Sequence, residues 1–474
     1  MVFNSFTYAL FLAVCLGFYF VLPLRGRQAF LLLASYVFYC WEKPVYGILL
    51  VLSTLLDDGV GLLMTRIAAP GRRKLVLALS ICGNLGMLGY FKYGDFLGAN
   101  LAGLGSWLGF AAHWTPMGIV LPVGISFYTF QTMSYAIQVY RRQIPATRDL
   151  LAFALYVSYF PQLVAGPIER ASHLLPQLLA YQRPTLQDWT YGLTRIAFGL
   201  FRKLVLADRF AIIVDPVFRD PLHFSSVTVL TAVLAFGGQI YFDFAGYCDI
   251  AVGSARLMGV RLTENFRRPF AASSIADFWT RWHLTLTGWL RDYLFAPLGG
   301  FRKGGARALL NATFVLALCG LWHGASWHFV LWGLYHAGLM NLYYLRRAWL
   351  RRGGRRAPPQ KTGLVLLLST VFTYLCTSMS CVFFRAPDVP TVGHVFQAMA
   401  GFQGAVAATP WIAWAYLGLI ALTVAVEMLQ EYGGLNQRIA RWPLPARALG
   451  LGLVIVLTLL LAVNNNTPYL YFQF

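Results

Sequence analysis

Apolar residues fill this chain in long, nearly uninterrupted runs, and polar residues are gathered in the short segments between them. A run of about 20 apolar residues can cross the hydrocarbon core of a bilayer as one helix, which satisfies its own backbone hydrogen bonds. Two runs are too long for single upright helices and one contains Pro161, so we expect these three to be broken, tilted or re-entrant. The pattern predicts about ten to twelve membrane-embedded helices, at residues 6–24, 29–41, 44–64, 75–91, 117–139, 150–165, 190–213, 226–259, 308–345, 362–384, 410–429 and 448–463.

Composition agrees with this pattern. Of the 474 residues, 58% are hydrophobic and 12% are charged, whereas about a quarter of the residues in soluble domains are charged. The chain is therefore predicted to be an all-α polytopic membrane protein with one integral-membrane domain, residues 1–474. The run 6–24 lacks a basic segment before it and a small-residue cleavage pattern, so we expect a retained helix and not a signal peptide.

Basic residues are distributed unevenly between the runs. The loops expected at 92–116 and 385–409 are nearly neutral, so the positive-inside rule places the basic clusters in the cytoplasm and both termini outside. This bias and anionic lipids explain the net charge of +20 better than nucleic-acid binding does. The clusters are Arg25 and Arg27; Arg66, Arg72, Arg73 and Lys74; Arg141, Arg142 and Arg148; Arg202 and Lys203; Arg302 to Arg307; Arg346 to Arg356; and Arg438, Arg441 and Arg447.

The seven cysteines lie mostly within apolar runs and include no Cys-x-x-Cys pair. This spacing argues against a disulfide framework and against a zinc site. We therefore expect no metal.

His323 stands in one of the most apolar stretches, within Leu321-Trp322-His323-Gly324. Ionisable residues inside a membrane are costly and mark functional sites by default. The alternative is a structural hydrogen bond between helices that pack closely at Gly320 and Gly324.

A second histidine, His283, follows a segment with helix-start chemistry. Ser274 and Asp277 have the spacing of a capping box, and Asp277 stands four residues before Arg281. On such a helix Trp279, Trp282 and His283 share one face. The alternative is an amphipathic helix at the membrane interface, with tryptophan at headgroup depth.

Further polar residues surround these histidines in the sequence. Asp243 and Asp249 lie near the end of one apolar run, and Glu264 and Asn265 follow it. The triplet Arg291-Asp292-Tyr293 precedes the run that contains His323. Paired acids can relay protons, although they more often satisfy arginines or backbone groups.

These motifs, taken together and in this order, resemble the membrane-bound O-acyltransferase (MBOAT) family. The similar branch is the alginate O-acetyltransferase type, which includes cellulose and peptidoglycan O-acetylation proteins, and the resemblance extends from Met1-Val2-Phe3-Asn4-Ser5 to the last six residues. Departures are Cys248 where serine is usual, Thr280 where arginine is common, and an additional His328. The motifs are Asp243 to Asp249, Glu264-Asn265-Phe266, Phe278-Trp279-x-Arg281-Trp282-His283, Arg291-Asp292-Tyr293-Leu294, Pro297-Leu298-Gly299-Gly300, Leu321-Trp322-His323-Gly324 and Gly333-x-Tyr335-His336.

The resemblance implies that His323 is the main catalytic residue and His283 its partner, around a tunnel through the membrane within the motif region 264–345. Imidazole suits acyl transfer to a hydroxyl because its pKa lies near neutrality, and burial favours its neutral, proton-accepting form. For the other histidines (His113, His173, His328 and His336) a structural role is favoured. We expect the remaining motif residues to bind substrate: Trp279, Arg281, Trp282, Arg291, Asp292, Tyr293, Asp249, Glu264 and Asn265.

The family's acyl donor is acetyl-coenzyme A or, in the D-alanylation branch, an aminoacyl carrier protein. The expected function is transfer of acetyl from cytoplasmic acetyl-coenzyme A across the inner membrane for O-acetylation of an envelope or secreted polysaccharide. An extracytoplasmic SGNH-hydrolase-like partner would complete the reaction. Alternatives are a D-alanyl transferase of the teichoic-acid type and, from another class, a lipid or polysaccharide transporter. Basic residues expected to attract the polyanionic donor are Arg267, Arg268, Arg302, Lys303 and Arg307.

The last eleven residues, 464–474, form an unusually aromatic tail that the charge pattern places outside the membrane. Eleven extended residues reach about 35 Å, enough to return to the bilayer midplane. The related teichoic-acid system has a similar ending whose tyrosine is thought to accept the acyl group. We therefore expect Tyr471 to take the acetyl group near His323 and pass it outward, the alternative being an aromatic anchor at the headgroup layer.

Overall fold

The computed structural model describes residues 1–352, 361–402, 411–463 and 469–470, and these residues form helices joined by loops. The chain forms two compact units. The first contains Met1–Gly199 and Tyr247–Thr263, and the second contains Leu200–Gly246 and Glu264–Phe474. The all-α, polytopic class predicted from the apolar runs is confirmed.

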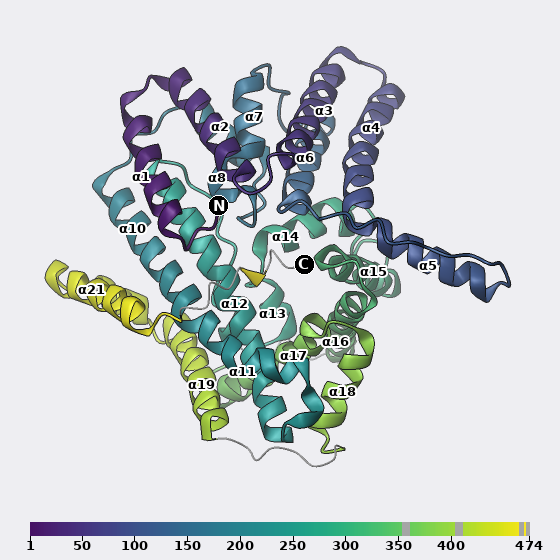
Figure 1. Cartoon of the computed structure of the whole chain (residues 1–474), viewed down its shortest axis with the longest axis vertical. Coiled ribbons are helices and arrows are strands. Elements are labelled where there is room, and N and C mark those ends of the chain that lie inside the picture. Colours follow the sequence, from purple (N-terminus) through teal and green to yellow (C-terminus); the bar gives the residue numbers. More distant parts are fainter. Residues whose placement is uncertain (353–360, 403–410, 464–468, 471–474) are drawn as a thin grey trace. The chain divides into compact units, whose positions relative to one another are not determined.

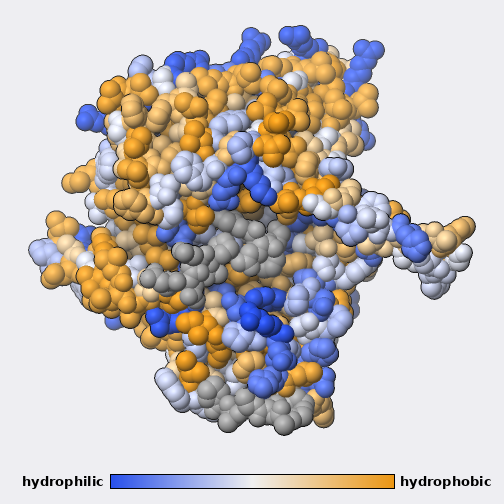
Figure 2. Space-filling view, viewed as in Figure 1, coloured by the Kyte–Doolittle hydropathy of each residue, from blue (hydrophilic) through white to orange (hydrophobic). Residues whose placement is uncertain are grey.

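The first unit is built from α1 to α10. Helices α3, α4 and α6 pack against one another (Figure 1) around a buried Asp57, whose carboxylate accepts hydrogen bonds from Ser80 and Asn84. Apolar side chains cover much of the outer surface around α1–α4 (Figure 2), as expected for helices that face lipid. The helices are α1 (Phe6–Val21), α2 (Leu24–Cys40), α3 (Tyr46–Arg66), α4 (Pro70–Leu88), α5 (Gly94–Trp107), α6 (Ile125–Tyr140), α7 (Leu150–Ser158), α8 (Phe160–Leu163), α9 (Ala171–Leu179) and α10 (Leu186–Phe201).

The second unit carries the histidine motifs. Its helices are the π-helix η2 (Arg202–Ala207), α11 (Asp208–Arg219), α13 (Ile275–Trp279), α14 (Leu284–Leu290), the π-helix η5 (Arg291–Phe295), α15 (Gly305–His323), α16 (Trp327–Arg352), α17 (Gly363–Arg385), α18 (Val389–Met399), α19 (Trp411–Glu431), α20 (Leu435–Ala440) and α21 (Leu444–Leu461). Helix α12 (Ser226–Leu257) contributes residues to both units.

Seven helices of the described part are long and apolar enough to cross a membrane: α3, the continuous segment Pro70–Trp107, α12, α15, α17, α19 and α21. The long run predicted at 226–259 is one unbroken helix of 32 residues, α12. The run at 308–345 is broken after His323 into α15 and α16, and the run at 150–165 is broken before Pro161. The loops expected at 92–116 and 385–409 are wrong in part, because they contain α5 and α18.

Close packing of α15 and α16 fixes the position of His323. A side chain at Gly320 would come within 2.0 Å of the Phe329 carbonyl oxygen, and one at Gly333 within 2.2 Å of the Leu316 carbonyl oxygen. Only glycine therefore allows the two backbones to approach this closely. The close packing predicted at Gly320 and Gly324 is confirmed, since a side chain at Gly324 would also collide with the Phe329 ring.

Candidate active site

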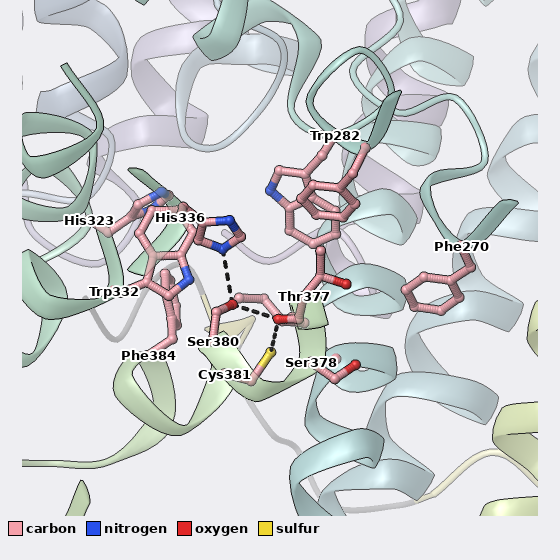
Figure 3. A pocket seen from close by; sticks show the side chains of 13 residues that line it. Phe270, Trp282, His323, Trp332, His336, Thr377, Ser378, Ser380, Cys381 and Phe384 are labelled. Atoms are coloured by element: carbon pink, nitrogen blue, oxygen red, sulfur yellow. Dashed lines mark hydrogen bonds between the residues drawn. The ribbon is translucent and has the colours of Figure 1, made fainter. Parts of the chain in front are cut away.

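A small cavity in the second unit is lined by two of the histidines, His323 and His336 (Figure 3). Its volume is about 40 Å³, room for little more than one or two water molecules. The walls come from α12, α15, α16, α17 and the loop after α13, and they are mostly aromatic, with the hydroxyls of Thr377, Ser378 and Ser380 on one side.

His323 is the last residue of α15, and the following Gly324 has an extended backbone, so the helix ends at the imidazole. The side chain is buried, and rings surround it. The ring centroids of Trp322, Trp332 and Phe384 lie 4.9, 5.1 and 5.1 Å from that of the imidazole. This aromatic surrounding holds the imidazole in place within a site that excludes bulk water.

The predicted helical stripe of Trp279, Trp282 and His283 is wrong. Ser274 does cap a helix, accepting a hydrogen bond from the Asp277 N–H, but α13 ends at Trp279. His283 directly precedes the next helix, α14, at its N-cap position, and has a left-handed backbone (φ 43°). Such a conformation is strained for a residue with a side chain and persists where the surroundings impose it, often at functional sites.

Burial also overturns the alternative of an interfacial amphipathic helix. Trp279, Trp282 and His283 are only 8, 8 and 1% exposed. The Trp282 ring stacks on Phe278, with ring centroids 5.4 Å apart, and lines the small cavity. These aromatic residues are therefore part of the protein interior.

Asn265 fixes the orientation and the tautomer of His283. The Asn265 side-chain oxygen accepts hydrogen bonds from the backbone N–H and the hydroxyl of Thr285, which identifies it as the amide oxygen. The same oxygen lies 3.1 Å from Nδ1 of His283, so Nδ1 carries the proton and donates. Nε2 consequently presents a lone pair, the form that a general base needs.

The buried surroundings of His283 also favour its neutral imidazole. The residue lies outside the membrane-spanning helices, and burial lowers the pKa of its imidazole to about 3. The neutral imidazole is therefore retained at physiological pH. The Trp322 ring contacts both His283 and His323, with ring centroids 6.0 and 4.9 Å away.

We expect His283→Ala to lower acyl transfer about a hundredfold, less than loss of the main catalytic base, because His283 orients substrate in the proposed mechanism. Asn265→Leu should reproduce most of this loss, since it releases the Nδ1 proton from its acceptor while keeping a side chain of similar size. The rates are measured with purified protein. Wild-type activity in Asn265→Leu would show that the tautomer of His283 is not important.

His336 was predicted from the sequence to have a structural role, but the structure places it in the candidate active site. It is 1% exposed and lines the same cavity as His323. Nε2 lies 3.0 Å from the Ser380 hydroxyl, which donates its own hydrogen to the Thr377 carbonyl oxygen (Figure 3). Nε2 is therefore the protonated nitrogen, and Nδ1 is an acceptor. The available signal was the motif Gly333-x-Tyr335-His336, which follows His323 across a short turn.

The other predicted substrate-binding residues lie in varied surroundings. Arg281 bridges Asp277 and Glu431, at 2.7 and 2.9 Å, which indicates a structural ion-pair network. Tyr293 is buried against Trp289. Glu264 is exposed. Three further predicted residues form ion pairs: Arg291 and Asp292 with each other, at 2.8 Å, and Asp249 with Arg195, at 2.6 Å within the first unit.

A second, much larger cavity adjoins the histidine site. Its volume is about 950 Å³, within the range of cavities that hold drug-sized ligands and cofactors. It lies among α13, α14, η5, α15 and α16, and three arginines, Arg291, Arg302 and Arg347, line it together with aromatic residues. Of these three arginines, Arg291 and Arg302 were predicted from the sequence to bind or attract substrate, and Arg347 was not.

Trp279 forms the partition between the two cavities. It lines the large cavity, and its ring contacts His336 and Trp332 of the small one, with ring centroids 5.1 and 6.1 Å apart. One side chain, Trp279, thus lines the large cavity and contacts two residues that line the small one.

Tyr471 lies outside the described residues, but the two residues directly before it, Tyr469 and Leu470, are described. Tyr469 and Leu470 are 1 and 4% exposed. This part of the tail is buried within the second unit and is not a free aromatic terminus.

Comparisons with known proteins show the family to which this chain belongs. The model of the MBOAT, membrane-bound O-acyltransferase family matches residues 128–384. A probable alginate O-acetylase of Pseudomonas putida is 34% identical over the full length of both chains. The peptidoglycan O-acetyltransferase of Helicobacter pylori is 32% identical over 81% of this chain and 77% of its own length.

The chain therefore belongs to the membrane-bound O-acyltransferase family and is an acyltransferase of the alginate O-acetylase-like branch. The teichoic acid D-alanyltransferase of Bacillus subtilis is also similar, at 29% identity over 56% of this chain and 69% of its own length. Because this is a family of acyltransferases, the chain is assigned to the enzymes and not to the lipid or polysaccharide transporters.

Proposed function

We propose that this chain takes an acetyl group from cytoplasmic acetyl-coenzyme A and passes it outward for O-acetylation of a cell-envelope or secreted polysaccharide. The observation that carries the proposal is the pair of adjoining cavities: a large one with three arginines, and a small one with His323, separated by Trp279. Two relatives that cover most of this chain are named for O-acetylation of alginate and of peptidoglycan. We place the protein in the inner membrane, with its basic clusters in the cytoplasm and both termini outside.

In the proposed reaction the large cavity holds the donor. Coenzyme A is polyanionic, and Arg302 and Arg347, which line this cavity, supply positive charge, whereas Arg291 also lines it but is paired with Asp292. The aromatic residues Phe295, Phe301, Tyr343 and Tyr344 supply apolar surface for the rest of the molecule.

The chemistry takes place at the partition. The neutral imidazole of His323 removes the proton from the attacking hydroxyl, and the oxygen forms a bond to the thioester carbonyl carbon. The carbon–sulfur bond then breaks, and the leaving thiolate takes the proton from the imidazolium, which restores neutral His323 and releases coenzyme A. His283 and His336 present acceptor nitrogens that can orient the hydroxyl. We propose Tyr471 as the first acceptor, with an SGNH-hydrolase-like extracytoplasmic partner that moves the acetyl group to the polymer.

The test is incubation of the purified protein with radiolabelled acetyl-coenzyme A and, in parallel, with a D-alanyl carrier protein. We expect release of coenzyme A and labelling from the first donor. Transfer from the carrier protein alone would overturn the proposal in favour of the D-alanyl alternative, which the similarity to the teichoic acid D-alanyltransferase supports.

Neutralising Arg302 and Arg347 together is expected to raise the apparent KM for the donor about tenfold, because both line the large cavity and attract its charges. Added salt should likewise raise the apparent KM of the wild-type protein for the donor, because it screens these charges.

The matched control is the double variant Lys303→Gln/Arg307→Gln. It removes the same charge from residues that were also expected to recruit the donor but do not line this cavity. Arg267 and Arg268, the other expected residues, already pair with Glu431. An equal rise of KM in both double variants would mean that the cavity is not the donor site.

A further inference from the structure

A cluster of three charged side chains is buried in the second unit. Lys203 Nζ lies 2.8 Å from Asp208 Oδ1 and 2.8 Å from Asp243 Oδ1. The three residues are 1, 4 and 2% exposed. Burying charges is costly unless they are paired and hydrogen-bonded, so such a cluster is retained where it has a specific role or is fully satisfied.

The π-helix η2 makes this cluster possible. Lys203 and Asp208 are five residues apart, a spacing that points to different faces of an α-helix. In a π-helix, residues five apart are joined by backbone hydrogen bonds and lie on the same side. The cluster contains two carboxylates and one ammonium group, so Lys203 alone does not balance it.

The C-terminal segment supplies a further partner. The backbone N–H of Leu470 donates to the second carboxylate oxygen of Asp243, at 2.9 Å. The ring of Tyr469 lies against Lys203, with Nζ 4.8 Å from the ring centroid. The first contact is a hydrogen bond to a carboxylate and the second is a buried cation–π contact. Both kinds of interaction are stronger than the corresponding interactions between neutral groups.

The chain before the tail meets the same elements. The Val463 N–H donates to the Leu204 carbonyl oxygen at 3.1 Å, and Arg209 donates to the Leu461 carbonyl oxygen at 2.8 Å. The segment is thus held at two places: residues 461–463 on η2 and α11, and residues 469–470 on η2 and α12.

The cluster also adjoins the histidine site through one residue. Phe244 follows Asp243 on α12, and its ring contacts the His283 imidazole, with ring centroids 4.9 Å apart. The residue that binds the tail and the residue that packs on His283 are therefore neighbours on α12.

We infer that Lys203, Asp208 and Asp243 form a docking site for the C-terminal segment, and that Asp243 is a positioning residue for acyl transfer. It holds Leu470 by its backbone N–H, one residue before Tyr471 in the chain. This role rests on the proposed relay through Tyr471.

The test removes the hydrogen-bond donor without touching any charge. Leu470→Pro has no backbone N–H at this position, whereas the matched control Leu470→Ala keeps the N–H and loses side chain only. Asp243→Asn is the partner variant: it keeps the side-chain volume, leaves Lys203 paired with Asp208, and offers Leu470 a neutral acceptor in place of a charged one.

Two measurements are made on the full-length protein in membranes or nanodiscs. The first is amide hydrogen exchange of the C-terminal peptide. We expect the exchange rate to increase in the order wild type, Asp243→Asn, Leu470→Pro, and the rate in Leu470→Pro to exceed that of the wild type by about tenfold or more. The second is transfer of acetyl to the tail, which should fall in the same order, while donor-dependent release of coenzyme A to water stays within about twofold because the donor cavity is unaltered.

A merely structural role would give a different result. If Leu470→Pro and Leu470→Ala lower transfer equally, or if coenzyme A release falls together with transfer, the docking site is overturned. Faster exchange of the tail with unchanged transfer would likewise overturn the positioning role. Failure of the proposed function is recognised separately, because wild-type protein would then neither release coenzyme A nor acquire a label.

Discussion

Replacement of His323 by alanine is expected to abolish acyl transfer, with a loss of about a hundredfold to ten-thousandfold, the range that general-base catalysis contributes. His323 lines the small cavity at the end of α15, and alanine is smaller than histidine, so the substitution introduces no new collision. The amount of protein in the membrane should therefore remain nearly unchanged. Transfer is measured as surface acetylation in cells and as labelling of purified protein.

His328→Ala is the matched control for this variant. His323 and His328 are both 5% exposed, but His328 does not line the cavity, and its Nδ1 lies 2.9 Å from the Phe383 carbonyl oxygen. We expect its loss to cost stability, about 1 kcal/mol for one hydrogen bond, and to spare catalysis. Substantial residual transfer in His323→Ala at normal expression would remove His323 as the essential base.

Tyr471→Phe is expected to abolish labelling of the tail and O-acetylation of the polymer, while release of coenzyme A by transfer of acetyl to water remains. A phenol has a pKa of about 10, so an imidazole deprotonates it more readily than a sugar hydroxyl, and the aryl ester formed is activated for onward transfer. Phenylalanine keeps the size and hydrophobicity of the side chain and deletes only the nucleophile. The relay and the headgroup anchor therefore give opposite outcomes.

Tyr469→Phe is the corresponding control, because it removes a hydroxyl two residues away and keeps the ring that lies against Lys203. We expect it to retain most of the acetylation. Mass spectrometry should find an acetyl group on Tyr471 when the outer partner is absent. Full polymer acetylation by Tyr471→Phe, or absence of that modification, would leave the anchor as the only role of the tail.

Several features of the site were predictable because they depend on residues near one another in the sequence. The Ser274–Asp277 cap and the Asp277–Arg281 ion pair follow from spacings of three and four residues, and both are present. The close packing at Gly320 follows from the absence of a side chain. Local interactions of this kind are largely independent of how the rest of the chain folds.

The surroundings of His283 could not be predicted in the same way. The spacing of Trp279, Trp282 and His283 fits one helix face, but the chain turns after Trp279 and places His283 in a left-handed conformation. Asn265, eighteen residues earlier in the chain, then fixes its tautomer. Tertiary packing outweighs local helix propensity here, as it often does at short segments.

The amino-acid sequence by itself determined that this is a polytopic, all-α acyltransferase and that His323 lies in an apolar helix, because long apolar runs and ordered motifs are properties of the chain alone. The tertiary structure decided that His336 shares the cavity of His323, that Trp279 separates it from the arginine-lined cavity, and that the buried Lys203–Asp243 pair holds Leu470. Each of these contacts joins residues on different helices, and Leu470 is bound through a backbone N–H that every residue except proline possesses. Such partners are selected by where the helices place them in space and not by any spacing along the chain.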